Sequence, residues 1–149
     1  MIANAVAAYV HHLAAFAVVA ALVYEHLAFR ENLTHAEALR LARMDLGYGI
    51  SAGVVFVVGM LRFFYFEKGP EFYLGSVAFH AKMTLFAIVG LVSIYPTVVF
   101  RSWNRTLRES KAPVIAAATA RRVRLALRIE LVCIAFVPLF AALMARGVV

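Results

Sequence analysis

The sequence predicts an all-α fold, an integral membrane four-helix bundle, and two observations predict it. The first is composition: 64% of the 149 residues are hydrophobic, against about 45–50% in a typical soluble domain, and the mean hydropathy is +0.86. The second is that the apolar residues gather in four long stretches with few charges. These stretches are residues 2–29, 46–66, 76–100 and 125–145. Each supplies the roughly 20 residues that a helix needs to cross a hydrocarbon core of about 30 Å, so we expect a single transmembrane domain over residues 1–149.

The first stretch is expected to be a retained helix rather than a cleaved signal peptide. No Lys or Arg precedes Arg30, whereas a signal peptide begins with a basic region and has an apolar core of only about 7–15 residues. The second helix is expected to begin before its apolar stretch, because Thr34 and Glu37 have the spacing of a capping box. From there it either runs through Asp45 into the membrane or breaks at the glycines that follow. A Gly-Pro turn is expected within residues 67–71, and Pro113 suits the first turn of the last helix.

Basic residues follow this plan. The connections between helices one and two and between helices three and four carry Arg30, Arg40, Arg43, Arg101, Arg105, Arg108, Lys111, Arg121, Arg122 and Arg124. By the positive-inside rule these connections are cytoplasmic and both ends of the chain are outside (N-out/C-out). We therefore expect a multi-pass protein of the bacterial inner membrane. The net charge of +7 points to anionic lipid headgroups at the cytoplasmic face as partners, and not to nucleic acid.

The best functional clue is a group of ionisable side chains inside the apolar stretches. His11 and His12 lie in the first stretch, Arg62 near the end of the second, and His80 and Lys82 near the start of the third. Because consecutive helices run in opposite directions, all five are expected at a similar depth near the outer face. Ionisable groups inside a membrane are costly and usually face the bundle interior or a ligand. Residues 80 and 82 are about 200° apart around a helix, so at most one of them points straight into the bundle.

This group of residues fits a haem- or porphyrin-type site between helices one, two and three. Neutral imidazole is a standard axial ligand of haem iron, which makes His11, His12 and His80 the candidate metal ligands. Arg62 and Lys82 are placed to pair with propionates. Haem b is the expected cofactor, and a porphyrin is the expected ligand or substrate. The alternative is that these side chains extend to lipid headgroups or form hydrogen bonds between helices.

A second set of ionisable residues lies toward the cytoplasmic side and comprises Glu25, His26, Asp45 and Glu130. Glu130 has no basic residue three or four positions away on its own helix. We expect its partner on another element, with Arg43 or Arg101 as candidates. A structural ion pair is favoured over a proton relay.

Gly49 and Gly53 form a G-x-x-x-G pattern in the second helix. Small residues at this spacing let two helices approach closely, either within the bundle or between copies in a homo-oligomer. A non-catalytic structural or assembly subunit is therefore an alternative function.

On these residues the chain resembles a bacterial family of four-helix membrane proteins, the domain of unknown function 2214. The resemblance covers nearly the whole length and is most specific in residues 45–59, 61–69 and 79–97. It implies the four-helix fold and brings no assigned activity.

More distantly, the layout resembles the HemJ-type protoporphyrinogen oxidases and the CopD-like copper-resistance membrane proteins. The HemJ-type enzymes oxidise protoporphyrinogen IX to protoporphyrin IX, bind haem b, and depend on a histidine in helix one and a lysine in helix three. This resemblance places the histidine at His11 or His12 and the lysine at Lys82, so His12 and Lys82 are the expected catalytic residues of a membrane oxidoreductase. The CopD-like resemblance implies instead a copper-handling protein whose histidines bind the metal directly.

Overall fold

The computed structural model describes residues 2–66 and 74–146 of the chain. In these residues the elements are α1 (Ile2–Ala28), α2 (His35–Leu61), a π-helical turn η1 (Arg62–Phe66), α4 (Val77–Ser102), α5 (Asn104–Arg108) and α6 (Ala117–Ala145). The four long helices are each long and apolar enough to cross a membrane, which confirms the all-α prediction. The turn expected within residues 67–71 lies outside the described residues.

The second long helix begins at His35, eleven residues before its apolar stretch. The predicted capping box is present: the Thr34 side chain accepts a hydrogen bond from the Glu37 main-chain N–H, and the Glu37 carboxylate accepts one from the Thr34 main-chain N–H at 2.9 Å. These two bonds satisfy main-chain donors that have no partner inside the helix. The helix then continues without a break past Gly47 and Gly49 into η1.

The connection between α4 and α6 differs from the prediction. Pro113 does not lie in the first turn of the last helix, because α6 begins only at Ala117. The short helix α5 follows α4 instead, and residues 111–116 are not helical. The physical reason is burial: Pro113 is buried, and Ile115 packs against the core. These two apolar side chains hold the segment against the bundle as a non-helical connection.

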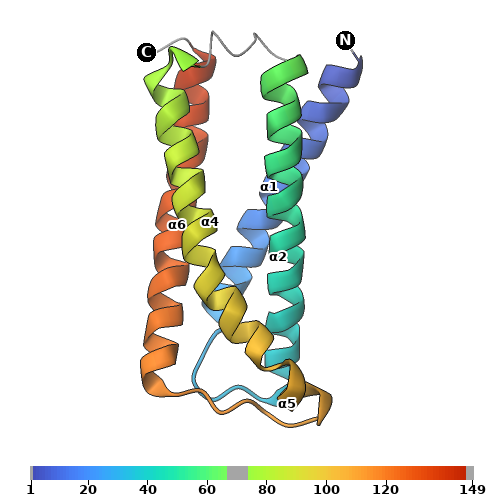
Figure 1. The fold of residues 1–149 in the computed structure, drawn as a ribbon, viewed down its shortest axis with the longest axis vertical. Helices are drawn as coiled ribbons and strands as arrows, with labels where there is room; N and C mark the ends of the chain where they lie inside the picture. The colour runs from blue at the N-terminus through green and yellow to red at the C-terminus, as the bar shows by residue number, and fades with distance from the viewer. Residues whose placement is uncertain (1, 67–73, 147–149) are drawn as a thin grey trace.

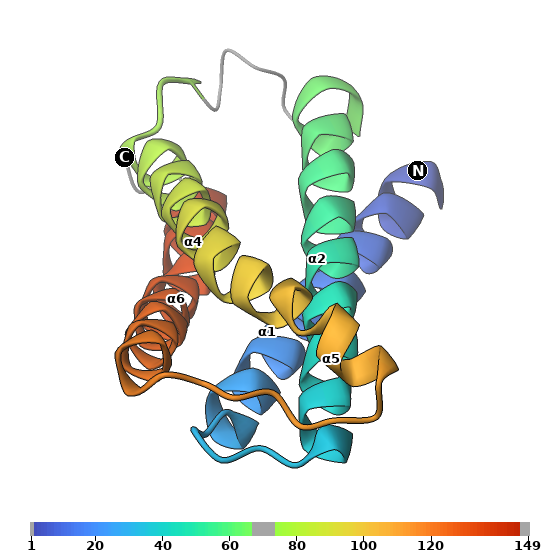
Figure 2. The same ribbon diagram turned by 60° about the horizontal axis from the view of Figure 1, so that its bottom comes forward.

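The long helices pack as two pairs, α1 with α2 and α4 with α6. The two pairs approach one another toward the end that carries α5 and diverge toward the other end, as Figures 1 and 2 show from two directions. We call the first the basic end, because the connections there, residues 29–34 and 103–116, carry Arg30, Arg105, Arg108 and Lys111. We call the other the terminal end, because α1 begins and α6 ends there.

The buried core lies toward the basic end. It is formed by side chains from all four long helices and both connections, namely Val18, Ala21, Leu22, Phe29, Leu33, Ala38, Leu41, Tyr48, Phe100, Trp103, Leu107, Ala120, Val123 and Leu127. Toward the terminal end, in contrast, many large apolar side chains are exposed, among them Tyr9, Phe16 and Phe64. Apolar side chains on the outside of membrane helices face lipid rather than water, so their exposure agrees with a membrane location.

Candidate functional sites between the helices

His11 lies on the face of α1 that packs against α2. A Cβ atom added to Gly59 would lie 3.3 Å from Cε1 and 3.7 Å from Nδ1 of the His11 ring. The main chain of Val55 also lies close to this ring. Val55 and Gly59 are four residues apart and therefore share one face of the helix. Gly59 thus leaves the space that the imidazole ring of His11 occupies between the two helices.

Two cationic side chains from other elements lie within electrostatic range of this ring. Arg62 is the first residue of η1 and Lys82 lies in the second turn of α4; the charges of both act on His11. Both side chains are partly buried, and the His11 Nδ1 atom is buried without a hydrogen-bond partner. The structure therefore brings His11, Arg62 and Lys82 together, and we call these three the His11 cluster. The ring of His12 also lies near it, with its centroid 6.0 Å from that of His11.

The other two histidines differ from His11 in their exposure. His12 is exposed, and its Nδ1 atom is 2.6 Å from the carbonyl oxygen of Ala8. His80 is also exposed, with Nδ1 2.9 Å from the carbonyl oxygen of Ser76. The three histidines predicted as metal ligands do not form one group, and residues 2–66 and 74–146 contain no group of three or more His, Cys, Asp or Glu side chains that could hold a metal ion.

Aromatic rings bridge the two helix pairs near the His11 cluster. Phe63 of η1 stacks on Phe79 of α4, with ring centroids 5.3 Å apart and ring planes 11° apart. Phe56 of α2 stacks on Phe86 of α4, with centroids 6.5 Å apart and planes 6° apart. The space between α2 and α4 is therefore one in which flat aromatic rings lie face to face.

A second polar group lies deeper in the bundle, toward the basic end. The Tyr48 hydroxyl donates a hydrogen bond to Glu130 Oε2 at 2.9 Å, and the Thr97 hydroxyl donates one to Asp45 Oδ1 at 2.6 Å. Asp45 and Tyr48 are three residues apart on one face of α2, while Thr97 comes from α4 and Glu130 from α6. We call these four residues the inner polar cluster.

The expected ion pair of Glu130 with Arg43 or Arg101 is wrong. Both arginines are exposed, and the partner of Glu130 is the neutral hydroxyl of Tyr48. Ion pairs on the surface of the described part of the chain join Arg30 to Glu37, Arg124 to Glu31, and both Arg105 and Lys111 to Glu109. A search for opposite charges could not find Tyr48 or Thr97, because neither is charged. The signal that could have found Tyr48 is its position one helical turn after Asp45.

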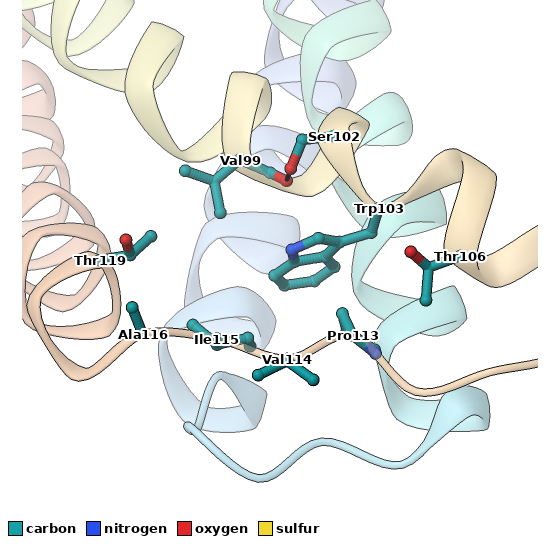
Figure 3. Close-up of a pocket in the computed structure, with 9 residues that line it drawn as sticks. All are labelled: Val99, Ser102, Trp103, Thr106, Pro113, Val114, Ile115, Ala116 and Thr119. Atoms are coloured by element: carbon teal, nitrogen blue, oxygen red, sulfur yellow. Dashed lines mark hydrogen bonds between the residues drawn. The ribbon is translucent and has the colours of Figure 1, made fainter.

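A pocket of about 360 Å³ opens at the basic end, between the end of α4 and the segment that leads into α6. Figure 3 shows the Trp103 indole between Val99 and residues 113–116. The pocket is also lined by Ser102, Thr106 and Thr119. No charged side chain lines this pocket, so the ionisable residues singled out above lie outside it.

The fold and these two groups define a class of protein: a helical membrane protein with polar side chains placed between its spans. The sequence model of one protein family, described as "Predicted membrane protein (DUF2214)", matches residues 3–149. The chain belongs to this family. Neither a curated protein nor a solved structure matches the chain. The more distant HemJ-type and CopD-like resemblances therefore stay predictions.

Proposed function

We propose that the protein binds a tetrapyrrole, haem b, at the His11 cluster, where His11 would hold the iron and Arg62 and Lys82 would pair with the propionates. The observation that supports this most is the buried, unpartnered Nδ1 atom of His11. Imidazole nitrogen is a common axial ligand of haem iron. Between the two histidines that the sequence leaves as alternatives, the geometry favours His11, because the His12 ring is exposed and its Nδ1 atom lies against its own helix.

Charge supports the same proposal. Two cations act on the His11 ring from two different helices, and they are carried by side chains that pair well with carboxylates. A porphyrin carries carboxylates at one edge and is apolar elsewhere. The stacked rings of Phe56 and Phe86 and of Phe63 and Phe79 would lie against its flat apolar part.

Haem, when bound, would supply one-electron chemistry in the membrane. The chain's own residues would hold and orient it: His11 at the metal, Arg62 and Lys82 at the carboxylates. We propose membrane redox chemistry of the protoporphyrinogen-oxidase kind as the reaction class. His80 is exposed and hydrogen-bonded to its own helix, which makes it a weaker candidate for a second ligand.

Two alternative functions, copper handling and a structural or assembly role, differ in their support. Direct binding of copper by histidines is less favoured, because the described residues contain no group of three or more His, Cys, Asp or Glu side chains that could hold a metal ion. A structural or assembly subunit is favoured by one observation: Gly49 and Gly53 meet no other atoms within 4 Å of an added Cβ. This G-x-x-x-G pattern is therefore open to a second copy or to another helix.

The neighbouring histidines provide a matched test of the proposed ligand. We expect His11→Ala to abolish the haem that co-purifies with the protein in mild detergent, measured as haem content per polypeptide. His12→Ala is the control, because it removes an exposed imidazole one residue away, and it should retain haem. Haem lost from His12→Ala and retained by His11→Ala would contradict the assignment.

A further inference from the structure

Three acidic side chains from three helices lie buried at the inner polar cluster: Asp45 and Glu130, which belong to it, and Glu25. Glu25 of α1 is 2% exposed, Asp45 of α2 is 5% exposed and Glu130 of α6 is 1% exposed. Asp45 and Glu130 are the charged neighbours that act on Glu25. The three carboxyl groups therefore share one region of the bundle, although they are far apart in the sequence.

Two oxygen atoms in this region have no hydrogen-bond partner. They are Oε1 of Glu25 and Oε1 of Glu130, and both are buried. Glu25 belongs to neither of the hydrogen-bonded pairs of the cluster, so its unpartnered oxygen points to a bound group independently of those pairs. A buried oxygen without a partner carries a substantial desolvation penalty, which a bound proton or cation would reduce.

Little positive charge lies around these three carboxyl groups to offset their negative charge. On α4 the polar groups that face it are Thr97, Ser93 and the exposed Arg101, whose charge acts on Asp45. On α1 the next residue is His26, whose Nδ1 atom is also buried and unpartnered. On α2 and α6 the groups are Tyr48, Asp45 and Glu130. An unpaired buried carboxylate is far more costly than a neutral carboxylic acid.

We propose that Glu25 and the inner polar cluster form a proton-binding site inside the bundle, with the proton held by the carboxyl groups of Glu25 and Glu130. A proton needs no cavity, whereas an organic cation does. A metal ion needs several converging ligands, and the described ranges of the chain contain no such group of His, Cys, Asp and Glu. Binding is a simple protonation: a carboxylate oxygen gains a proton from water, and the carboxyl group becomes neutral. This proposal does not rest on the haem site, which involves other residues.

Infrared spectroscopy of the purified full-length protein tests this directly. A neutral carboxylic acid has a C=O stretching band that an ionised carboxylate lacks, and the band shifts in D₂O. We expect the unchanged protein to show this band at neutral pH and to lose it as the pH rises. Absence of the band from the unchanged protein at neutral pH would overturn the proposal, whether or not any variant folds.

Isosteric variants assign the band to residues. We expect Glu25→Gln and Glu130→Gln each to remove part of it. Glu109→Gln is the matched control, because Glu109 is exposed at the basic end and pairs with Lys111 at 2.9 Å, and it should leave the band unchanged. A band of full intensity in both Glu25→Gln and Glu130→Gln would place the proton elsewhere and overturn the proposal.

Discussion

His11 and His12 are adjacent in the sequence, yet their rings lie in different surroundings. The sequence predicts their depth in the membrane, because helical rise is constant. It does not predict the rotation of α1 about its axis, which depends on how α1 packs against α2. Gly59 determines this outcome locally, because it leaves room for one imidazole ring. The same limit applies to Glu130, because a search for opposite charges along the sequence passes over the neutral partner Tyr48.

The space at Gly59 leads to the first prediction. Gly59→Leu should displace the His11 ring from between α1 and α2, and we expect haem content to fall by about tenfold or more, as when groups that orient a metal ligand are altered. Haem content per polypeptide is the measurement. Gly53→Leu is the control: it makes the same change in the same helix where nothing lies within 4 Å, and it should keep its haem. Equal haem content in the two variants would refute the role given to Gly59.

A second prediction concerns the hydrogen bond from Tyr48 to Glu130. Tyr48→Phe removes a donor to a carboxyl group that is 1% exposed, and we expect the free energy of unfolding to fall by about 1–3 kcal/mol. Titration with a denaturing detergent measures this change. Tyr9→Phe, which removes an exposed hydroxyl from α1, should be close to neutral. No difference between the two variants would mean that the bond contributes little to stability.

Among the elements, the long helices were the most predictable from the sequence. Hydropathy alone located all four, and the spacing of Thr34 and Glu37 located the start of α2 correctly. The connection between α4 and α6 was less predictable. Pro113 suits a helix start by its geometry, but burial of Pro113 and packing of Ile115 against the core keep residues 111–116 out of the helix. Tertiary packing overrides a local preference in this segment.

The capping box provides the third prediction. Thr34→Ala removes the side chain that accepts from the Glu37 N–H, and we expect a loss of about 0.5–2 kcal/mol in the free energy of unfolding. At the start of α6, Ala116 has extended main-chain geometry and provides no side-chain hydrogen bond. Ala116→Ser supplies the missing acceptor and should raise the free energy of unfolding. Detergent titration compares both variants with the unchanged protein, and a stable Thr34→Ala would contradict the first expectation.

At the level of the whole molecule, two helix pairs meet at the basic end and enclose most of the core there. Hydropathy predicts that there are four helices but not which of them pair, since every long helix has an apolar surface. The His11 cluster and the inner polar cluster lie at different depths, because Arg62 follows the end of α2 whereas Asp45 and Tyr48 lie in its first half. A site for haem toward the terminal end and a proton site nearer the basic end would allow electron and proton steps to be separated in space.

The fourth prediction is the orientation of the bundle. The positive-inside rule places the basic end in the cytoplasm. In a Cys133→Ala background, which removes the single cysteine of the chain, we expect Ala3→Cys to react with a membrane-impermeant maleimide applied to intact cells or spheroplasts. Lys111→Cys should react only after permeabilisation. The reverse pattern would invert the topology.

The most direct test of the proposed function is the visible absorption spectrum of the unchanged protein. The protein would be expressed with ample haem, purified in mild detergent, and measured when oxidised and after reduction with dithionite. We predict a Soret band, with α and β bands that sharpen on reduction, as expected for haem b. A spectrum without these bands would contradict haem binding at His11 and leave the metal-handling and structural alternatives.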